Sequence, residues 1–286
     1  MSVVELSLVL FGISLFAGVL GSLLGLGGGF VIVPVLTLAF HLDIRLAIGT
    51  SIVAVAATSS AGAARNVGQS ITNLRVATLL AVATTIGAVS GALLSGVFDA
   101  RFLFGLFGLV LALSGVQMLR GSRQGPTASG RPVVLAARVK SRLTNRLALD
   151  SAYYDEAERT EVPYVVANTG LGLGLMYLAG GISGLLGIGS GVLKVPAMDL
   201  AMHIPMKVST ATSNLLIGLT AAASAVVYFS RGDIDPLIAG PVAIGVLLGA
   251  TQGSRLLAGI RADRLRVLFV IALLAVAVQM LWKGIS

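Results

Sequence analysis

The chain has 286 residues, of which 56% carry apolar side chains and only 11% are charged, and its mean hydropathy is +0.96. A soluble domain is nearer a quarter charged, so this composition excludes an ordinary soluble enzyme, a disordered chain and a nucleic-acid-binding domain. The formal charge of +8 comes from cations that lie between apolar runs, where they are typical determinants of membrane topology.

The chain has no cysteine and only two histidines. This count predicts no disulfide, no thiolate nucleophile and no cysteine-based metal site. No spacing of serine, histidine and carboxylate residues stands out as catalytic, and no histidine cluster suggests a metal. We therefore expect neither a cofactor nor an enzymatic activity.

Ten apolar runs follow one another along the chain, five on each side of a polar interval. Long apolar runs without two-residue alternation favour membrane helices over a barrel, so we predict an all-α polytopic membrane protein. Since a crossing needs roughly 20 residues, the second run of each half is too short for an untilted one. The domain boundaries we predict are a first transmembrane repeat at 1–120, a cytoplasmic linker at 121–161 and a second transmembrane repeat at 162–286. The runs lie at about 5–24, 29–40, 46–63, 74–97, 102–119, 162–186, 191–202, 208–229, 236–257 and 265–282.

An offset of 162 residues aligns the two halves. It places Gly18, Gly25, Gly29, Pro34, His41, Thr50 and Gln117 on Gly180, Gly187, Gly191, Pro196, His203, Thr212 and Gln279. Because five runs per half is an odd number, the second copy should be inverted in the membrane relative to the first. The positive-inside rule then favours external termini and a cytoplasmic linker. An eight-span alternative would leave the basic segment 255–266 outside and is disfavoured.

The linker is basic between Arg120 and Arg146 and becomes acidic between Asp150 and Glu161. Within it, the stretch 133–149 spaces apolar residues among cations. Two interpretations remain open: a helix lying on an anionic leaflet, or a solvated connection between the repeats.

Each half contains a glycine-rich segment followed by proline. Residues 25–36 read Gly-Leu-Gly-Gly-Gly-Phe-Val-Ile-Val-Pro-Val-Leu, and 187–198 read Gly-Ile-Gly-Ser-Gly-Val-Leu-Lys-Val-Pro-Ala-Met. Paired glycine and proline interruptions in corresponding halves indicate the binding site of a transporter, with helix N-termini that favour anions. The alternative is that these glycines only permit tight helix packing. We predict binding residues in both segments: Gly27, Gly28, Gly29, Gly189, Ser190 and Gly191.

These two blocks, Gly25 to Pro34 and Gly187 to Pro196, resemble those of the TauE/SafE family of membrane transporters. The resemblance covers nearly the whole chain, including both halves and the central interval. It implies a bacterial-type inner-membrane carrier for sulfite, sulfoacetate or related sulfur-containing anions, without specifying the cargo.

Polar residues inside the apolar runs are further candidates for the site, because they are costly in a membrane and usually functional. Lys194 replaces Ile32 of the first repeat and could balance a bound anion, or alternatively form an ion pair or snorkel to the surface. Asp199 and His203 stand four residues apart, which predicts one helix face and either proton coupling or an interfacial helix end.

Hydroxyl and amide side chains near the start of the third run of each half could donate to sulfonate or sulfite oxygens. Alternatively, they could cap those helices or form hydrogen bonds between helices. They are Thr50, Ser51, Thr212, Ser213 and Asn214. Arg65 could grip an oxyanion with two N–H groups or anchor the cytoplasmic end of its run.

The hypothesis that unites these features is a secondary carrier whose repeats move around a midplane site. The partners we expect are a small anion and the lipid bilayer, no nucleic acid, and a homodimer is compatible with the sequence. An anion channel and a membrane scaffold or sensor remain as alternatives.

Overall fold

The structure is a computed structural model that describes residues 3–24, 28–68, 71–123, 147, 149–155, 160–189, 191–256 and 262–285. It confirms the predicted all-α membrane class, because nearly every described element is a helix. Within these ranges, five helices are long and apolar enough to cross a membrane on their own. These segments are Ile44–Ala64, Leu74–Ser95, Ala100–Gln117, Thr169–Leu186 and Met206–Ser230.

The two halves contain the same series of helical elements. The first half consists of α1 (Val3–Leu24), α2 (Gly29–Pro34), a π-helical turn η1 (Val35–Ala39), α3 (Ile44–Gly68), α4 (Leu74–Ser95) and α5 (Ala100–Arg123). The second consists of α8 (Thr169–Leu186), α9 (Gly191–Pro196), a π-helical turn η2 (Ala197–Ala201), α10 (Met206–Ser230), α11 (Pro236–Leu256) and α12 (Ala262–Ile285). The starts of α2 and α9, at residues 29 and 191, differ by the 162 residues of the sequence offset.

Proline explains why each short second helix changes its winding. Pro34 and Pro196 have no N–H, so the regular i→i−4 hydrogen-bond ladder is interrupted where they stand. In both halves the chain continues beyond the proline as a five-residue π-turn. The turn is followed by a residue with positive φ, His41 at 54° and His203 at 59°. The second segment of each half is therefore a short helix that starts at a glycine-rich break.

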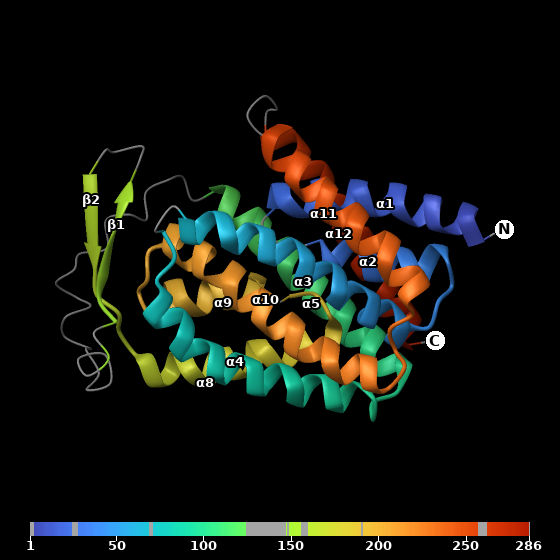
Figure 1. The fold of residues 1–286 in the computed structure, drawn as a ribbon, viewed down its shortest axis with the longest axis horizontal. Helices are drawn as coiled ribbons and strands as arrows, with labels where there is room; N and C mark the ends of the chain where they lie inside the picture. Colours follow the sequence, from blue (N-terminus) through green and yellow to red (C-terminus); the bar gives the residue numbers. More distant parts are fainter. Residues whose placement is uncertain are drawn as a thin grey trace.

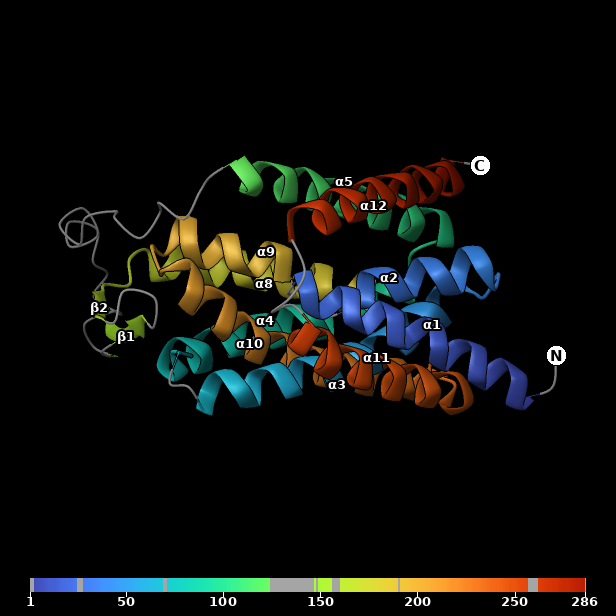
Figure 2. The same ribbon diagram turned by 90° about the horizontal axis from the view of Figure 1, so that it is seen from above.

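Helices of one half pack against helices of the other. The main contacts join α1 with α11, α4 with α8, α5 with α12, and α3 with α10. Because α11 corresponds to α4 and α8 to α1, the first two contacts are equivalent, as an approximate two-fold axis requires. In Figure 2, α1 runs inward from the end that holds both termini, and α8 runs inward from the opposite end. How this axis lies in a bilayer stays a prediction.

Close helix packing depends on small residues at the crossing points. A Cβ atom at Gly184 of α8 would collide with the carbonyl oxygen of Ala88 on α4. Without that atom the two backbones approach directly, which is how helices associate when water provides no hydrophobic driving force between them.

A two-stranded antiparallel hairpin, which our sequence analysis did not predict, lies between the halves. Strand β1 (Ser151–Asp155) pairs with β2 (Thr160–Tyr164). Figure 1 shows the hairpin at the end of the bundle opposite the termini. The remainder of the predicted linker, including most of the stretch 133–149, lies outside the described residues.

The hairpin is anchored to the bundle through its aromatic side chains and Asn73. Tyr153 and Tyr164 are buried in an apolar cluster with residues of α4, α8 and α10. The Asn73 amide donates to the Leu149 carbonyl (3.0 Å) and to the Tyr164 hydroxyl (2.8 Å). Its oxygen accepts from the Val76 N–H (3.0 Å) and caps α4. Burial raises the pKa of the Tyr164 phenol above its ordinary value, although the Asn73 hydrogen bond opposes this shift.

At the opposite end of the bundle, two arginines hold the C-terminus of α4. Arg45 donates to the Phe98 carbonyl (2.9 Å), and Arg231 donates to the Ala92 carbonyl (2.6 Å). Arg231 also pairs with Asp233 (2.8 Å). Cations here satisfy the last carbonyls of the helix and the negative end of its dipole.

The close approach of α4 and α8 predicts opposite results for one substitution at two glycines of α8. Gly184→Ala should destabilise the protein by about 1–3 kcal/mol, because the new methyl group forces the helices apart. Gly174→Ala should be neutral or stabilise by up to ~1 kcal/mol, since nothing lies within 4 Å of the place its methyl group would take and alanine favours the helix. Thermal unfolding in detergent measures both, and equal melting temperatures for the two variants would contradict this account of the packing.

Candidate functional site

The two glycine-rich breaks meet in the interior of the molecule. Gly28 (φ +77°) and Gly189 (φ +73°) adopt the left-handed conformation that glycine tolerates best, and both are buried. The helical hairpins α1–α2 and α8–α9 therefore enter the bundle from opposite ends and turn back inside it (Figure 2). A non-helical backbone at this depth is stable only when protein or a water-filled cavity surrounds it.

Ser51 of α3 connects the two breaks. Its hydroxyl donates to the Gly187 carbonyl (2.8 Å), and it also lies 3.3 Å from the Gly29 carbonyl. A Cβ atom at Gly29 would be 2.7 Å from the Ser51 hydroxyl and 2.8 Å from the Gly187 oxygen. Glycine is thus required at position 29, where the two segments are in contact. The Ser51 hydroxyl provides a hydrogen-bond donor for the Gly187 carbonyl, which lies just beyond the end of α8.

Two further hydroxyls from the predicted set are buried without a hydrogen bond. Thr50 is 0% exposed and Ser213 is 1% exposed, and neither hydroxyl oxygen has a partner in the described structure. A buried polar group without a partner is costly, so such groups suggest a place that water or a ligand would fill. The capping alternative is wrong for both, because α3 begins at Ile44 and α10 at Met206.

Lys194 is fully buried on α9, three residues after Gly191. Its ammonium donates to the Thr220 hydroxyl (2.9 Å), which itself reaches the Leu216 carbonyl (2.9 Å). The side chain does not extend to the surface, so it is not a snorkelling anchor in this structure. An amine surrounded by protein, with a neutral hydroxyl as its partner, can bind an anion strongly if one reaches it.

Thr220 is a contact that our sequence analysis missed. The signal that could have found it is the repeat itself, because the same offset that relates Lys194 to Ile32 relates Thr220 to Thr58. A buried threonine at the same place in both halves indicates a shared position beside the short helix.

The remaining predicted residues lie at different places in the structure. Thr212 accepts from the Asn73 N–H (3.3 Å), so its hydroxyl lies at the start of α4. Asn214 is turned toward Gly62 of α3, where a Cβ would be 3.4 Å from the Asn214 amide nitrogen. Gly191 begins α9 and is buried. Gly27, Ser190 and the side chain of Arg65 lie outside the described residues.

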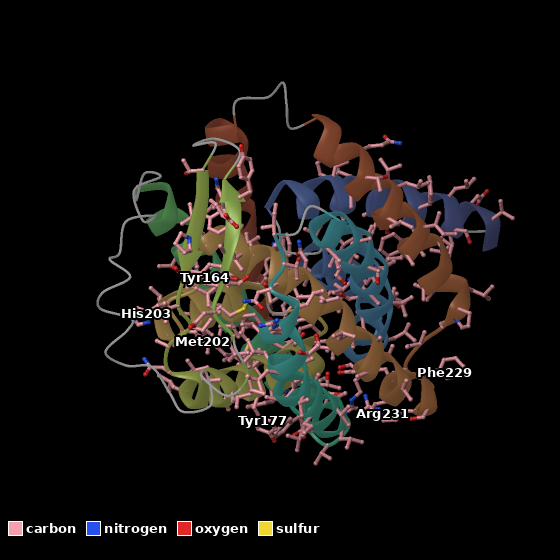
Figure 3. All side chains as sticks on the ribbon, turned by 60° about the vertical axis from the view of Figure 1, so that its left-hand side comes forward. Tyr164, Tyr177, Met202, His203, Phe229 and Arg231 are labelled. Carbon is pink, nitrogen blue, oxygen red and sulfur yellow. The ribbon has the colours of Figure 1, made fainter. Side chains whose placement is uncertain are left out.

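Asp199 and His203 do not share a helix face, which corrects our prediction. Asp199 lies in η2, which ends at Ala201, and His203 follows it with a positive φ. Its Nδ1 atom is buried without a hydrogen-bond partner. The preceding residue, Met202, is buried in the same apolar cluster as the hairpin residue Tyr164, and Figure 3 labels all three side chains. Within the described ranges, no three histidine or acidic side chains come together in a way that could hold a metal.

A small cavity borders the first of the two short helices. Its volume is about 10 Å³, close to the space that one water molecule needs. Ile32 contributes to its wall together with Leu10, Ile13, Ser14, Ala17, Val35 and Leu36. Apart from the Ser14 side chain this wall is apolar, whereas the corresponding place in the second half holds Lys194.

Comparisons with known proteins agree over the whole chain. The profile of the family described as "Sulfite exporter TauE/SafE" matches residues 10–280. The chain is 27% identical to the probable membrane transporter protein YunE of Bacillus subtilis, over 97% of this chain and 98% of that protein. It is 29% identical to a probable membrane transporter protein of Xylella fastidiosa (strain 9a5c), over 93% of each. No solved structure matches the chain significantly.

The contact between the breaks predicts different effects for two equivalent serines. Ser51→Ala should lower stability by about 1–3 kcal/mol, because the buried Gly187 carbonyl loses its donor. Ser213→Ala removes a hydroxyl that has no partner here, so it should change stability by less than about 0.5 kcal/mol. Thermal unfolding of both variants in detergent measures this difference. A larger loss of stability for Ser213→Ala than for Ser51→Ala would show that the hydrogen bond from Ser51 to the Gly187 carbonyl is unimportant.

Proposed function

The chain belongs to the sulfite exporter TauE/SafE family of membrane transporters, and from this premise we propose that it moves a small sulfur-containing anion. The candidates are sulfite, sulfoacetate or a related organosulfonate. Transport is driven by a gradient or by the membrane potential, and the cargo binds where the two glycine-rich breaks meet.

The observation that carries this proposal is the meeting of the two breaks at Ser51, on a helix that also holds a buried hydroxyl without a partner. Ser51 joins both segments, and the hydroxyls of Thr50 and Ser213 are buried without partners. Lys194 supplies a positive charge one helical turn beyond the second break. Hydroxyl and ammonium groups can together donate hydrogen bonds to the oxygens of a sulfite or sulfonate group. A full positive charge is therefore not needed at every donor.

The burial of the breaks favours alternating access over a channel. Gly28, Gly29, Gly187 and Gly189 are all buried, so this arrangement is closed around the proposed site. An open pore needs a continuous wet path, whereas a carrier passes through a state that is closed on both sides. Cargo would enter when one helical hairpin moves away from α3 and α10.

We place the protein in the inner membrane with the hairpin end toward the cytoplasm. Both termini lie at the other end of the bundle (Figure 1). The loops at the end that holds the termini contain acidic residues as well as basic ones, and the acidic residues are Asp43, Asp99, Asp233 and Asp235. At the hairpin end lie the cations Arg75 and Lys207. This distribution agrees with the positive-inside rule.

Replacement of Lys194 tests the proposal, because transport and stability should respond in different directions. Lys194→Met should reduce anion flux at least tenfold, since the charge that binds the cargo is lost. Its melting temperature should stay equal or rise, because an apolar side chain of similar length replaces a buried charge. Flux of sulfite and of sulfoacetate into liposomes that contain the purified protein gives the measurement.

Lys207→Met is the matched control, because it removes an exposed cation from the start of α10 and should leave flux near the unaltered rate. Unchanged flux in a folded Lys194→Met variant would remove this lysine from the site. Absence of flux for every anion with the unaltered protein would contradict the proposed function itself.

A further inference from the structure

In the part of the chain that the structure describes, only one buried side chain has an ionisable group that carries a formal charge. Among its buried polar side chains, all but two are serine or threonine hydroxyls; the exceptions are Asn73 and Lys194. Lys194 alone among them carries a charge when protonated, and the partner that the structure gives it is neutral. Among the buried side chains that the structure describes, Lys194 alone can therefore give the proposed site a positive charge.

The equivalent place in the first half has the same surroundings without the charge. Ile32 replaces the lysine and is 3% exposed. Thr58, which corresponds to Thr220, reaches the carbonyls of Ala54 (3.1 Å) and Val55 (3.2 Å). Thr220 reaches those of Leu216 (2.9 Å) and Ile217 (3.0 Å), which are the equivalent positions. Thr58 and Thr220 therefore make equivalent hydrogen bonds in the two halves. Only the second half has a lysine beside its threonine.

A low-dielectric interior makes the number of charges decisive. One ammonium and one singly charged anion form a neutral pair, so a closed state that holds them carries no net charge. A doubly charged anion would leave one negative charge uncompensated away from water, which is strongly unfavourable. Ile32, which is buried at the position equivalent to Lys194, is apolar and supplies no charge to balance it.

We propose that Lys194 makes the carrier selective for singly charged anions, and that the apolar residue Ile32 is what excludes doubly charged ones. This inference rests on the proposed transport function and narrows its substrate class. Within that class it favours hydrogen sulfite or a monosulfonate over sulfoacetate, which carries a sulfonate and a carboxylate.

Two anions of nearly the same shape test the charge rule directly. Methanesulfonate and sulfate are both tetrahedral at sulfur but carry one and two charges at neutral pH. The unaltered full chain in liposomes should move methanesulfonate at least tenfold faster than sulfate. Ile32→Lys, whose new ammonium would find Thr58 where Lys194 finds Thr220, should shift this ratio toward sulfate at least tenfold.

Two control variants separate charge from shape. Ile32→Met adds length without charge and should keep the preference of the unaltered protein. The double variant Ile32→Lys, Lys194→Ile moves the single charge to the other half, and it should again prefer methanesulfonate. If Ile32→Lys does not fold, thermal stabilisation of the unaltered protein by each anion still gives the ratio of affinities, because a ligand stabilises the state that binds it.

The outcomes distinguish this inference from the function on which it rests. If the unaltered protein moves sulfite yet binds methanesulfonate no better than sulfate, the charge rule is wrong and the carrier function stands. A folded Ile32→Lys variant with an unchanged ratio also overturns the rule. If the unaltered protein moves none of the three anions, the proposed function itself fails.

Discussion

A peptide backbone that leaves its helix inside a membrane must find new hydrogen-bond partners, because lipid offers none. This constraint governs the centre of the molecule. Two glycine-rich segments interrupt their helices there, and Ser51 donates to the Gly187 carbonyl and lies near that of Gly29. A Cβ atom at Gly29 would lie too close to the Ser51 hydroxyl and to the Gly187 carbonyl oxygen, so the two segments are in contact through their backbones. The same geometry that stabilises the breaks brings both halves of the chain to one place.

Much of this architecture could be predicted from the sequence. The apolar runs indicated the helical membrane class, and the offset of 162 residues relates the bounds of equivalent helices in the structure. The glycine and proline pattern indicated where the short helices begin. These features depend on local chemistry and on repetition along the chain, so a single sequence is enough to show them.

Other features depend on contacts between distant residues and could not be predicted in this way. The hairpin forms because Tyr153 and Tyr164 find an apolar cluster and Asn73 finds Tyr164, 91 residues away in the chain. Thr212 was expected beside the breaks, but it accepts a hydrogen bond from the Asn73 N–H. Spacing suggested one face for Asp199 and His203, whereas the π-turn ends before His203. In each case the tertiary partner, and not the local pattern, decides the position of the side chain.

For the alternating access that we propose, the hairpin at one end of the bundle has an energetic consequence. Perfect two-fold symmetry would make the inward-open and outward-open conformations degenerate. Here one end is fastened by Asn73, Tyr153 and Tyr164, while the connections 40–43, 96–99 and 231–235 at the other end are short loops. Opening the hairpin end would disrupt the contacts of Asn73 and the two tyrosines, whereas opening the other end would disrupt the hydrogen bonds of Arg45 and Arg231. Because these two sets of contacts differ in kind, the two conformations should differ in free energy. In such a mechanism the resting population would follow the difference in strength between the contacts at the two ends.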